Sequence, residues 1–379
     1  MRFEVMRPEE FGESELTRWR ALQGTTAALA SPFLSPEFTL AVSRFRANAR
    51  VAVLTDDAGI AGLFPYERHA LGIGHPIGAG LTDCQGLIGP PGLEFDVRAL
   101  LRACRLSVWE FDHLLAEQTA FAPYHAKTRA EPVMDLGDGF GAYAEHVRLQ
   151  APKTIKTVRY KDRKLGREVG EVTYTFSERD PAELRRLMDW KSDQYRRTGR
   201  TDRFAEPWIV SLVEHLHETG AAVLSVLRAG GRPISAHLGL RTGPVMAGWF
   251  PAYDIEFGKY SPGMIGHLRM AESAASAGVT QIAMGRGGRE YKDWLKNGEF
   301  PIAEGRAARA SAAAGLRWVR EAPVRRARSA VLASPRLYAC ADRVLKTYAR
   351  LRHNGQTAEH SPVPGNGPLR SSHETGNAA

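Results

Sequence analysis

The strongest constraint on the fold comes from residues 221–295, where three strand-like segments precede a helix, a strand and a second helix. A Gly-Gly turn and a Gly-Pro turn separate the three strands, and such turns are typical of short antiparallel connections. The first helix begins near Pro262, where proline is well tolerated because a first-turn N–H has no intrahelical partner. Antiparallel strands followed by a crossover helix and a further strand predict an α/β fold with a mixed sheet.

A fainter copy of this pattern occupies the first part of the chain. Residues 51–68 read as a strand, an Asp-Asp-Ala-Gly turn and a second strand, and a helix and a strand follow them. The repeat predicts two tandem α/β domains with mixed central sheets. We place them at residues 1–138 and 139–305, followed by a basic helical extension over 306–352 and a disordered tail over 353–379.

The composition fits a cytoplasmic enzyme. Of the 379 residues, 43% are hydrophobic and 25% are charged, as in soluble globular proteins. The three cysteines (Cys84, Cys104 and Cys340) are far apart, which favours a reducing compartment. We find no apolar run of the length that a membrane-spanning helix needs, and no signal peptide.

The positive charge is concentrated in one segment. The chain has 51 Lys and Arg against 42 Asp and Glu, a net charge of +9. Residues 306–352 hold twelve of the basic residues and two of the acidic ones, which leaves 39 against 40 elsewhere. Basic amphipathic helices can bind an anionic membrane surface or a polysaccharide synthase, while the simpler interpretation is solvated helices that pack on the body. A nucleic-acid partner is not expected unless the donor is a charged tRNA.

Several common catalytic motifs are absent from the sequence. It contains no GxxxxGK[ST], GxSxG, HExxH or CxxC, which argues against P-loop nucleotide hydrolysis, serine-hydrolase chemistry and a zinc site. The glycine-rich residues 285–290 end in Glu290 instead of glycine, and they do not belong to an opening βαβ unit. We therefore expect no bound metal or cofactor.

The turn from Lys259 to Gly263 is the clearest candidate for a binding site. It leads into the predicted helix, so the backbone N–H groups of Gly263, Met264 and Ile265 are expected to point outward from a helix N-terminus. With Lys259 beside them they would form a cradle for a pyrophosphate. The alternative is an ordinary strand-to-helix turn.

A series of short motifs in this order resembles the CelD/BcsL-like acetyltransferases, named for cellulose biosynthesis, within the GNAT superfamily. The same architecture is similar to that of the FemABX aminoacyltransferases, which pair two GNAT-type domains. The resemblance runs from about Ser31 to Glu304 and is densest from Lys191 to Lys292. It rests on SPFLSPEF, WEFDHL, QYRRTGR, PISAHLGL, WFPAYD, KYSPG and GREYK.

The resemblance implies acyl transfer from acetyl-CoA or another acyl-CoA, as co-substrate, to an amine or hydroxyl of a polysaccharide- or envelope-related acceptor. The strand that ends at Tyr253 would be central, and its splay from the next strand would admit the pantetheine arm. Tyr260, Ser261, Gly263 and Met264 would then lie at the phosphates. The usual GNAT turn has more glycines and basic or Gln residues, so the donor stays open.

Two other functions stay open. FemABX-like aminoacyl transfer from charged tRNA is the first, and a strongly basic face on the body would favour it. The second is a non-catalytic accessory protein that docks on a membrane-bound polysaccharide synthase, which would place this cytoplasmic protein at the inner face of the membrane.

Acyl transfer from a thioester needs a base, an acid for the leaving thiolate and donors for the oxyanion. Asp254, at the end of the presumed central strand, is the candidate base, although aspartate there also caps turns and helices. Tyr291 is the candidate acid, because a phenol with a pKa of about 10 suits a thiolate, and packing of the last helix is its alternative. Lys292 could meet a phosphate.

The remaining candidates concern the acceptor. His237, a third catalytic candidate, alternates with apolar neighbours on its strand and so could face the acceptor cleft. Tyr253, a candidate for substrate binding, ends the presumed central strand. Lys191 falls on the apolar stripe of a predicted helix beside Tyr195, where a lysine either lies along apolar surface or reaches into a cleft. Asp83 and Asp112 are the polar residues of interest in the N-terminal half, which lacks a comparable turn and is expected to support the fold and acceptor binding without its own donor site.

Overall fold

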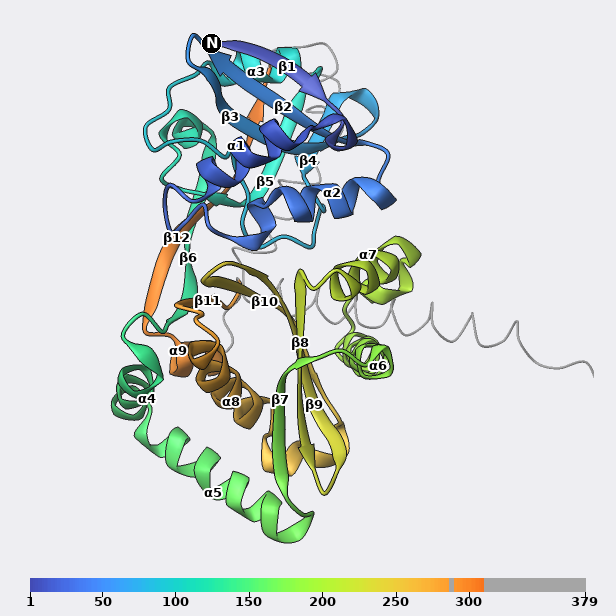
Figure 1. The fold of residues 1–379 in the computed structure, drawn as a ribbon, viewed down its shortest axis with the longest axis vertical. Coiled ribbons are helices and arrows are strands. Elements are labelled where there is room, and N and C mark those ends of the chain that lie inside the picture. The colour runs from blue at the N-terminus through green and yellow to red at the C-terminus, as the bar shows by residue number, and fades with distance from the viewer. Residues whose placement is uncertain (286–289, 310–379) are drawn as a thin grey trace, which may run out of the picture. The chain divides into compact units, whose positions relative to one another are not determined.

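The computed structural model describes residues 1–285 and 290–309 (Figure 1). Its strands are β1 (Arg2–Met6), β2 (Ala49–Asp56), β3 (Gly59–Arg68), β4 (Ile73–Pro76), β5 (Val108–Leu115), β6 (His125–Asp135), β7 (Val172–Glu178), β8 (Ala222–Ala229), β9 (Arg232–Thr242), β10 (Val245–Tyr253), β11 (Gln281–Ala283) and β12 (Gly298–Ala308). Its α-helices are α1 (Glu13–Gln23), α2 (Pro36–Phe45), α3 (Val97–Ala103), α4 (Gly139–Gln150), α5 (Pro152–Glu168), α6 (Pro181–Arg197), α7 (Pro207–Glu218), α8 (Pro262–Ser276) and α9 (Glu290–Leu295).

The described strands form one mixed sheet in the order β1-β2-β3-β4-β5-β12-β6-β11-β10-β9-β8-β7. In each half, successive strands pair antiparallel, and a parallel pair follows after a crossover that contains a helix: β4 with β5, and β10 with β11. The predicted hairpins, β2 with β3 and β8 with β9, are confirmed. The duplication inferred from the sequence is therefore present in the strand order.

The two halves exchange their last strands. β6, which follows β5 in the chain, pairs with β11, whereas β12, which follows β11, pairs with β5. β6 and β12 also pair with each other along most of their length (Figure 1). The sequence predicted neither strand, and a division of the chain at residue 138 therefore separates strands that share hydrogen bonds.

The structure has two helices, α4 and α5, where the sequence pattern predicts one. The pattern after Gly139 predicts a continuous helix, but α4 ends at Gln150 and α5 begins at Pro152. Proline has no N–H to continue the hydrogen-bond ladder and disfavours helical geometry at the residue before it. Ala151 accordingly has φ −132° and ψ 58°. Aspartate followed by proline is a typical helix start, and α6 accordingly begins at Pro181, with the Asp180 carboxylate accepting the Ala182 N–H.

Helices cover both faces of the C-terminal part of the sheet (Figure 1). On one face α6 and α7 pack on β8, β9 and β10, and their apolar residues join those of α1 and α2 in one core. On the other face α4, α5 and α8 pack on the same strands. The two faces of this part of the sheet are therefore covered by different sets of helices.

The predicted basic extension, 306–352, and tail, 353–379, lie outside the described residues, except that residues 306–308 end β12. Throughout residues 1–285 and 290–309, helices fall short of the length and apolarity needed to cross a membrane.

Candidate functional site

The site begins where two parallel strands separate. β10 pairs with β11 only from Val245 to Ala247, although β10 continues to Tyr253 and stays paired with β9 on its other edge. A bulge between Gly248 and Phe250 coincides with the point of separation. Among the described residues, no strand pairs with this edge of β10 beyond Ala247, and backbone groups on such an edge can bind an extended ligand by hydrogen bonding.

A cleft of about 720 Å³ follows this gap. It collects nine of the twelve residues predicted for the site: Lys191, Tyr195, His237, Tyr253, Ser261, Gly263, Met264, Tyr291 and Lys292. They come from α6, β9, β10, α8 and its preceding turn, and α9. Residues as far apart in the sequence as Lys191 and Lys292 thus meet at one opening in the sheet.

The turn before α8 has the least relaxed backbone of the site. Ser261 has φ 56° and ψ 52°, a left-handed conformation that is unfavourable for a residue other than glycine. Its hydroxyl accepts a hydrogen bond from Lys161 Nζ at 2.8 Å. One expectation for this turn is wrong: the N–H groups of Met264 and Ile265 do not point outward unpaired, because both donate to the Ser261 carbonyl. The Lys161 ammonium and Gly263, where a β-carbon would touch the Tyr253 ring at 3.7 Å, remain for an anion.

Two histidines and a tyrosine form a row inside the cleft. The ring centroids of His237 and His267 are 5.6 Å apart, and those of His267 and Tyr291 are 5.2 Å apart. His267 Nδ1 lies 2.6 Å from the Gly263 carbonyl oxygen, which can only accept, so Nδ1 holds the proton. The Nε2 atom of a neutral His267 is therefore a bare base.

Both imidazoles are neutral near pH 7. Burial, with smaller effects from His267 and Lys191, lowers the pKa of His237 to about 3. Burial also lowers the pKa of His267, and the charges of Lys292 and Lys191 act in the same direction, while the hydrogen bond to Gly263 opposes them. Neutral imidazole is the form that can accept a proton.

Two buried lysines donate hydrogen bonds to backbone carbonyls near the ends of the separating strands. Lys191 Nζ donates to the Pro251 carbonyl of β10 at 2.9 Å and lies 5.3 Å from the centre of the Tyr195 ring. Lys292 Nζ donates to the Gly285 carbonyl, just after β11, at 2.5 Å. Their side chains bring positive charge to both sides of the gap.

Three predicted residues do not line the cleft. The Asp254 carboxylate accepts the Glu256 N–H, capping a short 3-10 helix (Ile255–Tyr260), and pairs with Arg232 at 2.7 Å. Tyr260 is buried and donates to Glu168 at 2.7 Å. Lys259 is exposed and lies over the Tyr260 ring. The position of Asp254 thus fits the capping alternative better than a catalytic base.

Sequence reasoning missed three residues of the site. His267 lies one helical turn after Gly263, a spacing that places both on one face of α8. Lys161 comes from α5, which no local pattern connects to the turn. Asp83 was singled out without a role, and it lines the cleft from the N-terminal half. Among the described residues no group of three or more His, Cys, Asp or Glu could hold a metal ion.

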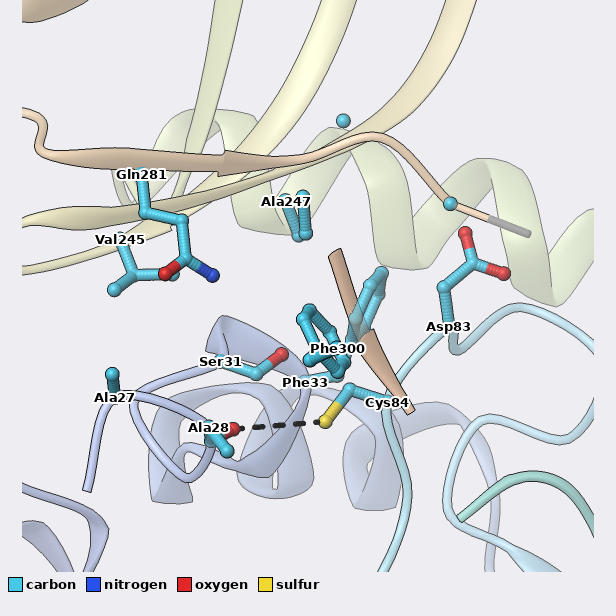
Figure 2. A pocket seen from close by; sticks show the side chains of 13 residues that line it. Ala27, Ala28, Ser31, Phe33, Asp83, Cys84, Val245, Ala247, Gln281 and Phe300 are labelled. Carbon is cyan, nitrogen blue, oxygen red and sulfur yellow. Dashed lines mark hydrogen bonds between the residues drawn. The ribbon is translucent and has the colours of Figure 1, made fainter. Parts of the chain in front are cut away.

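A small cavity of about 10 Å³, room for one water molecule, adjoins the cleft (Figure 2). Asp83, Gly248, Ala283 and Gly285 line both spaces. In Figure 2 the N-terminal half contributes Ser31, Phe33 and Cys84, and the opposite wall carries Val245, Ala247 and Gln281. The cleft therefore reaches the place where the two halves meet.

Comparison with known proteins identifies the C-terminal half. Residues 152–293 match the family model for the acetyltransferase (GNAT) domain. None of the curated proteins matches the sequence closely enough to count as a relative. The resemblance to GNAT proteins is thus confirmed for this domain, while the CelD/BcsL-like assignment stays a prediction.

Solved structures share the fold. A crystal structure of FemX superposes with a TM-score of 0.53 at 12% identity, covering 80% of this chain and 96% of that one. The C-terminal domain of a putative lysylphosphatidylglycerol synthetase from Agrobacterium fabrum gives 0.48 at 14% identity, covering 81% and 95%. A tandem GNAT protein from the clavulanic acid biosynthesis pathway gives 0.45 at 11% identity, covering 81% and 98%. The predicted α/β fold of tandem GNAT type is confirmed.

Proposed function

We propose that this GNAT-type N-acyltransferase moves an acyl group from an acyl-CoA to an amine of a polysaccharide- or envelope-related acceptor. The observation that carries the proposal is the neutral His267, with its bare Nε2 in a cleft that opens where β10 leaves β11. The nature of the acceptor rests on the motifs that resemble the CelD/BcsL-like acetyltransferases.

The acyl-CoA would lie along the gap that opens where β10 separates from β11. The pantetheine amides would pair with the edge of β10 that no described strand covers beyond Ala247, as an added strand does. The phosphates would lie at the turn before α8, where Lys161 supplies a positive charge and Gly263 has no side chain. Gly266, one turn further, also lines the cleft without a side chain in the way.

The chemistry needs one proton acceptor and one proton donor. As the acceptor nitrogen attacks the thioester carbonyl, His267 Nε2 takes the proton that the nitrogen loses, and an N–H on the free edge of β10 stabilises the oxyanion. When the C–S bond breaks, Tyr291 gives its phenolic proton to the thiolate. Tyr291 lies next to His267, so a proton can return from the imidazolium to the phenolate and restore both groups.

The acceptor would enter from the side of α6. Lys191, Gln194, Tyr195 and Arg200 line the cleft there, opposite the face that carries α8. Tyr253, half exposed at the end of β10, lies at the opening. We assign these groups, with His237 on the cleft wall, to acceptor binding.

One observation favours a second candidate, aminoacyl transfer from charged tRNA. Exposed basic residues follow one side of α5: Lys153, Lys156, Arg159, Arg163 and Arg167. Together with the neighbouring Lys161 at Ser261, they form a basic face close to the donor turn. Such a face suits a phosphate backbone. A strongly basic face on the body is the feature that we expect of a protein that uses charged tRNA as its donor.

Release of free thiol from acetyl-CoA in the presence of primary amines tests the proposal. We expect turnover with at least one amine, and a kcat about 100-fold lower for His267→Gln, the size of a general-base contribution, with unchanged acetyl-CoA affinity. His146→Gln, a change at an exposed histidine of α4, is the matched control. Equal kcat values for the two variants would contradict the role of His267, and turnover with aminoacyl-tRNA alone would favour the second candidate.

A further inference from the structure

A buried histidine in the N-terminal half lies between two carboxylates. His113 on β5 has a side chain that is 8% exposed, and its Nε2 lies 3.2 Å from Asp83 Oδ1. Its Nδ1 lies 2.9 Å from Asp112 Oδ1. Neither contact has the alignment of a hydrogen bond, so the contact is one of charge when the ring is protonated.

Gln85 fixes this cluster to the sheet. Its side-chain oxygen accepts the backbone N–H groups of Asp112 and His113, and its side-chain nitrogen donates to Asp112 Oδ1 at 2.8 Å. Backbone hydrogen bonds join Gln85 to His113 and to Leu115 on the same strand. The segment that carries Asp83 is therefore held against β5 two residues from the carboxylate.

The Asp83 carboxylate faces the proposed reaction site. It lines both the cleft and the adjoining cavity, and a methyl carbon at Gly285 would lie only 2.6 Å from Asp83 Oδ2. Figure 2 shows this carboxylate directed toward the chain that leaves β11. Lys292 also approaches this position: its Nζ would lie 3.6 Å from the same carbon, and it donates to the Gly285 carbonyl.

The charges of the cleft give Asp83 a distinct role. Lys191, Arg200 and Lys292 line it with positive charge, and Asp83 is the one carboxylate in the lining formed by the described residues. A primary amine arrives near pH 7 as a cation, which the three basic side chains repel and a carboxylate attracts. The bound ammonium gives one proton to solvent before its nitrogen attacks, and His267 takes the second proton during the attack. Among these groups only Asp83 can favour its entry.

We propose that Asp83 of the N-terminal half binds the amine of the acceptor, and that His113 is the positioning residue that holds the Asp83 carboxylate toward the cleft. The inference rests on the proposed N-acyl transfer. It gives the N-terminal half a direct part in the reaction site, although that half has no donor cleft.

The test measures thiol release from acetyl-CoA by the full chain, with glucosamine, ethanolamine and putrescine as amines, and acetyl-CoA affinity by titration. For the amine that supports turnover, we expect Asp83→Asn to raise KM about 10- to 100-fold, as loss of a charge-assisted hydrogen bond does, with acetyl-CoA affinity within twofold of native. Asp57→Asn, the same change in the exposed turn between β2 and β3, is the control and should leave KM unchanged.

A double-mutant cycle separates positioning from mere packing. His113→Leu should raise the amine KM severalfold, and it should add nothing in the Asp83→Asn background. Additive effects of the two changes, or an unchanged KM in Asp83→Asn, would overturn the proposal. Acetyl-CoA binding without turnover of any of the three amines would also overturn it, whereas loss of acetyl-CoA binding in the native chain would refute the proposed function itself.

Discussion

The two halves of the sheet follow the same strand order and differ in what fills the space beyond their parallel pairs. In the C-terminal half, β10 leaves β11 after Ala247 and a cleft follows. In the N-terminal half, β4 pairs with β5 only at Ile73 and Gly74, and the chain itself then occupies the space. Gln85 bridges to β5 at Leu114, and Ile88 bridges to β3 at Leu63.

Aromatic side chains complete the closure of the N-terminal half. Trp109 is fully buried, and its ring centroid lies 4.8 Å from that of Phe64 and 5.2 Å from that of Phe121. The C-terminal half instead places His237, His267 and Tyr291 around open space. The same strand order thus surrounds a filled core in one half and the proposed donor site in the other, and the residues next to the separating strand make the difference.

Two matched glycines test this contrast with the largest expected effect. Gly248 on β10 and Gly74 on β4 each belong to the strand that leaves a parallel partner. A β-carbon at Gly248 would lie 3.1 Å from His237 Nε2 within the cleft. Gly248→Val should therefore weaken acetyl-CoA binding by about 100-fold or more, because the ligand has to share this space with a side chain, as measured by titration calorimetry.

Gly74→Val should act on stability instead. Its β-carbon would lie 2.7 Å from Leu106 Cδ1 and 3.2 Å from Trp109 Cδ1. Overpacking of a filled core costs about 1–3 kcal/mol of unfolding free energy, which urea denaturation measures, and acetyl-CoA affinity should stay native. Comparable losses of acetyl-CoA binding in both valine variants would show that the halves do not differ as described.

The charge at the donor turn has a smaller expected effect. Lys161 donates to Ser261 Oγ, and loss of one charged contact to a phosphate corresponds to about a tenfold weaker affinity. Lys161→Ala should show this loss in the acetyl-CoA titration. Lys164→Ala, on the same helix but paired with Glu168, should bind as the native chain does, and an equal loss in both would point to general electrostatics instead of a contact.

Sequence reasoning reached the site where neighbouring residues define it. The turn 259–263, the helix start at Pro262 and the apolar stripe of α6 are local patterns. The residues that they single out, Ser261, Gly263 and Lys191, line the cleft. Asp254 also has a local signature, but capping and catalysis use the same residue type at the end of a strand, so the pattern could not distinguish them.

The remaining features depend on contacts between distant segments. β6 and β12 pair with each other and with strands of opposite halves, and strand pairing at such separation leaves no periodic signal in either segment. Lys161 and Ser261, like Asp83 and Gly285, meet only after the sheet has formed. The tautomer of His267 follows from its contact with the Gly263 carbonyl, which the sequence alone does not show.

The smallest expected effect concerns Asp254. Its carboxylate caps the 3-10 helix and pairs with an exposed arginine, so Asp254→Ala should lower the unfolding free energy by about 1 kcal/mol, the usual contribution of a cap. Because Asp254 does not line the cleft, kcat should stay within about twofold of native under saturating substrates. A loss of kcat as large as that of His267→Gln would restore Asp254 as the base.

The number of acetyl-CoA molecules that bind one chain tests the central claim most directly, because two related halves could each provide a site. Titration calorimetry of the full chain should give a stoichiometry of one, and Gly248→Val should abolish that binding. Two equivalents per chain, or one equivalent that survives Gly248→Val, would contradict the assignment of the donor site to the C-terminal half.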